Sequence, residues 1–477
     1  MKLSKFALAA AIAWGIYCGN AQAQDSRVPT AVRPTAFTNS YYYQGEGGAS
    51  PSDRPPPAPM AEVPPMAEVA PAAPMEAAAE EECTPWGLMT MLEGTCIGDR
   101  LNCRGIRIYG NMAQSMTFNF DSPPDRWNGP VTWTDRSNEY QMNQLWVGAE
   151  KATDASEKNW DLGGRVDVMW GTNHRFNTAW GLEDNWNNGN AFYGLAMPNL
   201  YAEVAHSDWK VKIGHFASPV GYFGIDTTQN IFNTLPYTYQ YGEPFTHTGV
   251  LATKTVSEKL TLGGGFTRGW DNFAGDPTNS GASPNLGVIG TATYTAENGG
   301  SIAYVNMWSN EVNQLGAGNF SGRYLQTLVL SRPLTETVTY VAQSDFGTQE
   351  AALASGRSAQ WYGLNQYLLY KRSDAVTWAA NFEWFRDEDG YRVGGFLPSL
   401  GGGSTVRGLP LARYGYQGNF FQVTVGPKWS PYKNLFVRPN LRFDWFDGTS
   451  PAANLRPYDA GNSNRQVIFG TDVVWTF

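Results

Sequence analysis

The sequence is poor in charge and has no long apolar run beyond its N-terminus. Only 16% of its 477 residues are charged and the net charge is −9, whereas an ordinary soluble domain has about 25% charged residues. The acidic balance argues against a nucleic-acid-binding protein. Past the N-terminus no apolar stretch approaches the roughly 20 residues that a membrane-spanning helix needs, which excludes a helical membrane protein.

The sequence also lacks the motifs of common enzymes. It contains no His-Glu-x-x-His, no Gly-x-Ser-x-Gly and no phosphate-binding glycine loop, and its four histidines lie far apart. We therefore expect no catalytic residues, no metal and no cofactor. His247, within Thr-His-Thr, is expected to be a hydrogen-bonded structural residue.

The first 23 residues have the pattern of a secretory signal. Lys2 and Lys5 precede an apolar stretch at residues 6–17, and Ala21-Gln22-Ala23 resembles a small-residue cleavage site. We expect export and a mature chain that starts at Gln24. No lipid anchor is expected at Cys18, because the bulky Tyr17 precedes it.

Two segments separate the signal from the main domain. Residues 24–82 are rich in Pro, Ala and Glu and repeat Pro-Met-Ala-Glu-Val, which predicts a disordered, partly polyproline spacer. This acidic spacer is either a passive tail or a tether to a periplasmic or cell-wall partner. Residues 83–104 form an apolar lead-in that is expected to act as a plug or a periplasmic cap.

Three cysteines remain after cleavage, in a compartment where disulfides persist. Cys96 can pair with Cys103, a bridge from Cys83 can form instead, or all three can be buried thiols. Zinc is not expected, because no histidine lies near them.

From residue 105 onward, apolar and polar residues alternate with the period of two that is typical of strands. In residues 159–171, Leu162 and Val166 share one face while Arg165 and Asp167 share the other. The same alternation is clear in residues 434–445 and 467–477. A sandwich core could produce it, but it continues across about sixteen expected strands. These are residues 106–120, 140–151, 160–171, 200–206, 209–216, 248–255, 259–269, 286–296, 301–308, 323–331, 335–346, 360–370, 375–386, 419–426, 434–445 and 466–477.

The connections between these strands are long and short in turn, with both chain ends on the short side. An even strand count with this alternation is the plan of a bacterial outer-membrane barrel. The prediction is an all-β fold, a closed antiparallel transmembrane β-barrel at residues 105–477. Because lipid cannot hydrogen-bond a backbone, the sheet must close, with apolar side chains outside and polar ones in the lumen.

The charged side chains expected to face inward are the candidate pore-lining residues. Rings of opposite charge across a wet lumen would bias which ions pass, although the same side chains could simply pair along the wall. Their mixed signs predict no strong anion or cation selectivity. They are Arg165, Asp167, Lys210, Lys212, Glu383, Arg438, Arg442, Asp444 and Asp472.

The connection at residues 217–247 is the candidate constriction loop, because its length allows it to fold into a lumen that would otherwise be wide. It carries Tyr237, Tyr239 and Tyr241. These alternate tyrosines could line a polar aromatic path for solutes, or form a short strand in the wall, which their spacing slightly favours.

A series of short motifs resembles the OmpL-like beta-barrel porin family (beta-barrel porin-2) from about residue 105 to 477. The motifs, in order, are Trp-Thr-Asp-Arg-Ser-Asn-Glu-Tyr-Gln-Met-Asn-Gln-Leu at residues 133–145, Asp-Leu-Gly-Gly-Arg-Val-Asp at 161–167, Lys-Ile-Gly-His-Phe at 212–216, Tyr-Gly-Glu-Pro-Phe-Thr-His-Thr-Gly at 241–249 and Gly-Trp-Asp at 269–271. The resemblance implies an outer-membrane channel without catalytic residues. The Pro/Glu-rich tail departs from the family pattern.

We expect a porin of the Gram-negative cell outer membrane that allows passive diffusion of small hydrophilic solutes or ions. Its partners would be outer-membrane lipid and those solutes, and a homo-oligomer is left open. The alternative is a structural or adhesive barrel tethered through its acidic tail. A barrel enzyme acting on lipids would need a lipid-side Ser/His pair, which we do not find.

Overall fold

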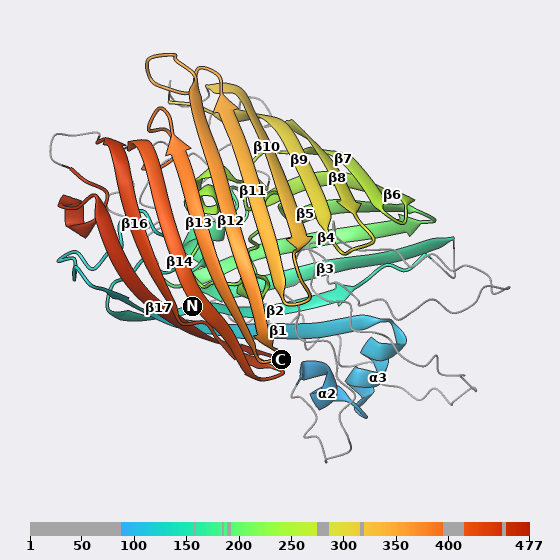
Figure 1. Ribbon diagram of the computed structural model, residues 1–477. Coiled ribbons are helices and arrows are strands. Elements are labelled where there is room, and N and C mark those ends of the chain that lie inside the picture. The colour runs from blue at the N-terminus through green and yellow to red at the C-terminus, as the bar shows by residue number, and fades with distance from the viewer. Residues whose placement is uncertain are drawn as a thin grey trace, which may run out of the picture.

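The computed structural model describes residues 87–155, 159–183, 186–187, 192–273, 286–314, 319–394, 415–450 and 455–477. The predicted signal, the spacer and Cys83 lie outside the described residues. One antiparallel sheet dominates and closes on itself as a 16-strand barrel with one extra short strand (Figure 1). The strands are β1 (Ile106–Asn119), β2 (Glu139–Lys151), β3 (Trp160–Gly171), β4 (Gly194–His206), β5 (Trp209–Ala217), β6 (Thr246–Ser257), β7 (Leu260–Thr267), β8 (Gly287–Thr295), β9 (Ser301–Val312), β10 (Phe320–Pro333), β11 (Val338–Gln349), β12 (Ala359–Ser373), β13 (Val376–Asp387), β14 (Gln417–Tyr432), β15 (Leu435–Val437), β16 (Asn440–Thr449) and β17 (Arg465–Thr476).

Each strand from β1 to β14 pairs with the next one in the chain, and β1 also pairs with β17, which closes the barrel. The strands expected from the sequence are confirmed, with one correction. The expected strand at residues 434–445 is broken, because β15 and β16 pair in turn with the same neighbours, β14 and β17. The break falls at Arg438 and Pro439, where proline has no N–H to donate to the sheet.

The two faces of the wall have opposite polarity. On β3 and β16, Leu162, Val166 and Leu441 are exposed on the outside, whereas Asp167 and Arg442 are fully buried on the inside. A soluble protein buries its apolar side chains and exposes its charges. The reversed arrangement is that of a barrel whose outer face meets lipid.

The last residue takes part in barrel closure. The backbone N–H of Phe477 donates to the carbonyl of Gly110 at 2.9 Å, and the N–H of Gly110 donates to the carbonyl of Phe477 at 2.8 Å. A Cβ on Gly110 would lie 2.4 Å from both the Phe477 ring and the Trp146 carbonyl oxygen. Glycine is therefore required where β1 receives the C-terminal aromatic residue.

Two short helices, α2 (Leu88–Leu92) and α3 (Cys96–Cys103), lie beside the start of β1, outside the barrel wall (Figure 1). The backbone N–H of Ile108 donates to the sulfur of Met89 at 3.3 Å. Cys96 is disulfide-bonded, while Cys103 is an exposed free thiol. The pairing of Cys96 with Cys103 is therefore wrong, as is the set of three buried thiols, and a bridge from Cys83 stays a prediction. In the described part of the chain, no helix is long and apolar enough to cross a membrane.

Candidate functional site

The interior of the barrel is the candidate site, and the connection between β5 and β6 is its main occupant. All of residues 218–245 are buried except Tyr222, Thr228 and Gln229, which are half-buried. The connection contains a short 3-10 helix, η2 (Thr227–Gln229), and a π-helical turn, η3 (Thr238–Gly242). Its hydrogen bonds reach inward-facing side chains of β1, β2, β11, β12, β13 and β16, so it lies across the inside of the barrel. We call residues 218–245 the inner segment.

Arg438 fixes the first half of the inner segment. Its Nε donates to Asp472 Oδ1 at 3.0 Å, and a second nitrogen also bonds the Asp472 carboxylate. The remaining N–H groups donate to the carbonyls of Thr227 and Asn230 and to the Thr227 hydroxyl. All five N–H donors of this buried guanidinium are thereby used.

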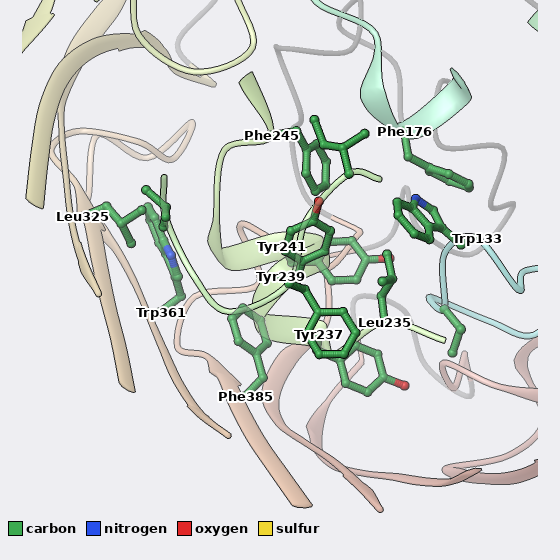
Figure 2. Packing of buried hydrophobic residues seen from close by; sticks show 14 of the residues in the cluster. Trp133, Phe176, Leu235, Tyr237, Tyr239, Tyr241, Phe245, Leu325, Trp361 and Phe385 are labelled. Atoms are coloured by element: carbon green, nitrogen blue, oxygen red, sulfur yellow. The ribbon is translucent and has the colours of Figure 1, made fainter. Parts of the chain in front are cut away.

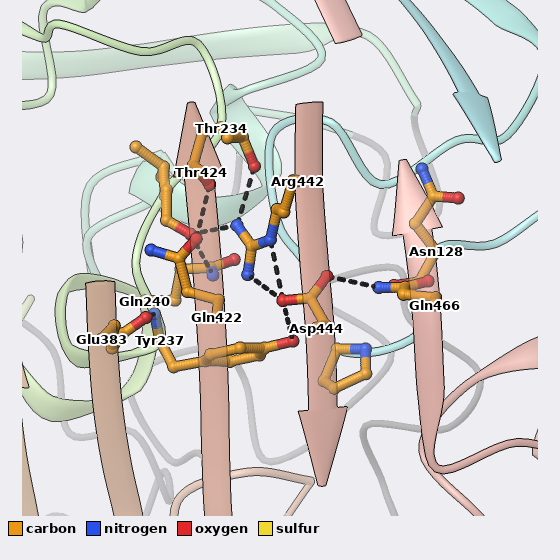
Figure 3. Close-up of polar contacts among 12 residues, drawn as sticks. Asn128, Thr234, Tyr237, Gln240, Glu383, Gln422, Thr424, Arg442, Asp444 and Gln466 are labelled. Carbon is orange, nitrogen blue, oxygen red and sulfur yellow. Dashed lines mark hydrogen bonds and ion pairs between the residues drawn. The ribbon is translucent and has the colours of Figure 1, made fainter. Parts of the chain in front are cut away.

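Arg442 and Asp444 fix the second half in the same way (Figure 3). The Nε of Arg442 donates to Asp444 Oδ1 at 2.8 Å, and its Nη1 donates to the Thr234 hydroxyl at 2.7 Å and the Leu235 carbonyl at 2.6 Å. Asp444 also accepts from the Tyr237 hydroxyl at 2.9 Å and from Gln466 at 3.0 Å. Arg442 and Asp444 thus form an ion pair within the wall, and the remaining N–H groups of Arg442 bind the inner segment.

Glu383 binds the start of η3. Its carboxylate accepts the backbone N–H groups of Tyr237 and Thr238 at 2.7 and 2.6 Å. The prediction that Tyr237, Tyr239 and Tyr241 form a wall strand is wrong, since these buried residues lie in and beside the π-helical turn that Glu383 binds.

The end of the inner segment is held by β11 and β12. Gln343 donates to Glu243 and, at 2.9 Å, to Asp345, and the Trp361 indole donates to the Gly242 carbonyl at 3.1 Å. Burial raises the pKa of the Glu243 carboxyl well above its ordinary value, and the neighbouring Asp345 carboxylate raises it further. The inner segment therefore places the carboxyl group of Glu243 beside the Asp345 carboxylate of the wall.

The opposite side of the segment meets β1 and β2. Asn111 donates to Asp226 at 3.0 Å, and Gln144 both donates to the Ile225 carbonyl at 2.7 Å and accepts from the Thr227 N–H at 3.1 Å. Burial raises the pKa of the Asp226 carboxyl, while its hydrogen bonds from Thr228 act in the other direction. Sequence reasoning missed these uncharged anchors, although Asn111 and Gln144 are polar positions on a buried strand face.

The other predicted inward charges divide into two groups. Arg165 and Asp167 form an ion pair with 2.6 Å between Nε and Oδ2, and Asp167 also accepts from Tyr109 and Asn199. Lys210 and Lys212 on β5 are only half-buried. The structure thus brings most of the predicted charges into local pairs rather than one continuous ring, and their role in a pore stays a prediction.

Further connections also fold inward, which the sequence did not predict. Arg175 makes a bidentate ion pair with Asp135 at 2.8 and 3.0 Å, joining the connections after β3 and β1. Asp387 accepts the backbone N–H groups of Tyr391, Arg392 and Val393 at 2.9, 2.7 and 2.7 Å. Carboxylates thus hold several connections in place.

Apolar side chains complete the packing inside the barrel. Trp133 and Phe176, from two other connections, belong to the same buried cluster as Leu235 and Phe245 of the inner segment and Trp361 of the wall (Figure 2). His247 is hydrogen-bonded to the Ser218 hydroxyl and the Gly269 carbonyl, both at 3.0 Å, so the expected structural role is confirmed.

The sequence from residue 105 to 477 matches the family described as "Putative beta-barrel porin-2, OmpL-like". The chain belongs to this family. No curated protein sequence gives a significant match. The expected outer-membrane porin barrel is confirmed, and the family and the fold resemble those of non-enzymatic channels.

Solved structures share the fold. An anion-selective porin from Comamonas acidovorans superposes with a TM-score of 0.53 at 9% identity, covering 78% of this chain and 99% of that one. OprB from Pseudomonas putida gives a TM-score of 0.50 at 11% identity, covering 80% and 96%. At these identities the likeness concerns the fold.

The family motifs coincide with contacts that organise the interior. Gln144 and Asp167 supply two of the networks described above, and Asp271 accepts the backbone N–H groups of Phe245 and Thr246, both at 2.8 Å. Asp271 thereby fixes the point where the inner segment rejoins the wall at β6. Within these motifs, Gln144 and Asp271 hold the inner segment, while Asp167 organises hydrogen bonds within the wall.

Proposed function

We propose that this chain is an outer-membrane porin for passive diffusion of small hydrophilic solutes or ions, narrowed by the inner segment. The observation that carries the proposal is the anchoring of this segment by buried charged side chains on the far wall, above all Arg438. A segment held by ionic hydrogen bonds keeps its position while solutes pass, so it sets a fixed size limit.

The water path follows the wall formed by β5 to β8. Several inward-facing residues there are small or polar and half-buried, among them Lys212 on β5, Thr253 on β6 and Gly263 on β7, whereas Leu251 and Ile289 are buried. A Cβ on Gly263 would lie 2.3 Å from the Thr291 hydroxyl, so only glycine fits beside Thr291 at this position. The two lysines on β5 give this path a positive charge.

Accessibility to a charged thiol reagent tests the path. In a Cys103→Ser background, Thr253→Cys should react with a membrane-impermeant methanethiosulfonate and lose conductance. Thr424→Cys, on the opposite wall at 1% exposure, is the control and should not react. Equal reaction at both positions, or at neither, would contradict this path.

Graded solutes test the size limit. Proteoliposomes should swell in small sugars and not in large polyethylene glycols, and removal of residues 24–104 should leave this cut-off unchanged. If the full chain is inactive and the truncated chain active, the segment at residues 24–104 blocks the pore. If both are inactive, the diffusion proposal fails.

A further inference from the structure

Four consecutive strands carry uncharged polar side chains on the outer face, halfway along each strand. These residues share their faces with exposed Trp308, Leu328 and Leu368, and they alternate with buried inward residues, so they point away from the lumen. We call them the polar band: Asn306 on β9, Gln326 on β10, Ser344 on β11 and Gln366 on β12.

Tyrosines on the same face satisfy one end of each glutamine. The hydroxyls of Tyr304 and Tyr324 donate to Gln326 Oε1 at 3.2 and 3.0 Å, and the Tyr340 hydroxyl donates to Gln366 Oε1 at 3.1 Å. In the part of the chain that the structure describes, neither glutamine NH2 group has an acceptor. Each amide thus keeps an unused donor on the outer surface.

The inner face of the same strands carries both apolar and polar side chains, and Thr327 on β10, Asp345 on β11 and Asn365 on β12 are buried there. Val305 and Met307 on β9, Leu325 and Val329 on β10, and Val341 on β11 are buried inside the barrel at 4% exposure or less. The polar band therefore interrupts an outer face that is otherwise largely apolar, as the outer face is elsewhere in the wall at Val166 and Phe443. A lipid-facing sector should be apolar on its outside.

Lipid tails cannot accept the free amide hydrogens of the polar band. Lipid head groups lie near the two rims, whereas the band lies in the middle of the strands. The band is uncharged, and it offers amide donors on Gln326 and Gln366 together with acceptor oxygens on Asn306 and Ser344. A surface of this kind is complementary to a copy of itself.

The adjoining strand β8 allows close approach. Its outward positions include Gly290 and Ala292, and Asn306 Oδ1 lies 2.7 Å from where a Cβ on Gly290 would be. Small residues beside polar ones are typical of protein contacts within membranes. We propose that the outer face of β9 to β12, centred on the polar band, is the contact surface between copies of this chain in the membrane.

The first test removes the amides. The full-length protein should sediment as an oligomer in detergent, and Gln326→Leu combined with Gln366→Leu should raise its dissociation constant about 10-fold or more. Gln114→Leu is a matched control, because Gln114 is an outward glutamine on β1 that accepts from the Tyr140 hydroxyl at 2.6 Å. A monomeric wild type, including one that binds lipid tightly, or an unchanged double variant would overturn the proposal.

A second measurement does not depend on removing the amides. In a Cys103→Ser background, a nitroxide at Ser344→Cys should be immobilised and shielded from lipid-dissolved oxygen. A nitroxide at Val425→Cys, which is 43% exposed on the outer face of β14, should be accessible. Equal oxygen accessibility at the two positions would overturn the proposal, whether or not the barrel conducts.

Discussion

The Arg438 guanidinium and the Asp472 carboxylate form an ion pair within the barrel wall, at 0% and 2% side-chain exposure. The other N–H groups of Arg438 donate to the carbonyls of Thr227 and Asn230 and to the Thr227 hydroxyl in the inner segment. The ion pair therefore links the stability of the barrel to the position of the segment. Removing one charge leaves the other buried without a counter-ion.

Asp472→Asn should lower the free energy of unfolding by about 3–5 kcal/mol, the usual cost of breaking a buried pair. Urea unfolding of the refolded protein in micelles measures this. Arg438→Met with Asp472→Leu should lose less than Asp472→Asn alone, since no isolated charge remains. If Asp472→Asn unfolds at the wild-type urea concentration, the ion pair does not stabilise the barrel.

The inner segment should loosen as pH rises. The pKa of Glu243 is raised above its ordinary value of 4.5 by burial and by Asp345. Below pH 4.5 this carboxyl is neutral whether the segment is packed or released, so packing is then most stable. As pH rises above 4.5, the released state ionises first and packing becomes weaker.

Current fluctuations in single channels should therefore increase from pH 4.5 to pH 8. Glu243→Gln keeps the size of the side chain and its hydrogen bond from Gln343 but removes its titration, so it should reduce the pH dependence. Some pH dependence should remain in this variant, because the carboxyl groups of Asp345 and Glu383 face the same region and are unchanged. Identical fluctuations in wild type and variant at every pH would show that Glu243 has no part in the effect.

Ion preference should depend on the two lysines of β5. Replacing both Lys210 and Lys212 by glutamine removes positive charge from the half-buried wall and should shift the reversal potential under a salt gradient toward cation preference. Lys254→Gln is the control, because Lys254 lies on the outer face over the Trp209 ring at 5.3 Å. A shift of equal size in the control would refute a lumenal role for the lysines.

The cysteines should differ in reactivity. Cys103 is exposed and free, so it should react with maleimide in the folded protein, whereas Cys96 should react only after reduction. Peptide mass spectrometry distinguishes the two. Labelling of Cys96 without reductant would contradict the disulfide.

The wall could be predicted from the sequence because its information is local. The period of two identifies which residues of a strand face lipid, and Asp167, Arg442 and Asp472 lie on the buried face as expected. The break between β15 and β16 was missed because alternation continues through Arg438 and Pro439 even where the backbone pairing is interrupted.

The interior depends on contacts between residues that are distant in the chain. Thr238 meets Glu383 across 145 positions, and Arg438 meets Thr227 across 211. The alternating tyrosines have the spacing of a strand, which is why the sequence favoured one. The residue that binds η3 is Glu383 on β13, and the spacing of the tyrosines does not reveal this distant contact. Sequence spacing alone also could not choose among the cysteine pairings.

Single-channel conductance tests the central claim, that a conducting barrel is narrowed by the inner segment. Ala217 pairs directly with Thr246, so a short Gly-Ser link can replace residues 220–243 without changing the ends of β5 and β6. The account predicts stable steps for the wild type and larger steps for this variant. Steps of unchanged size in the variant, or no steps from either protein, would contradict it.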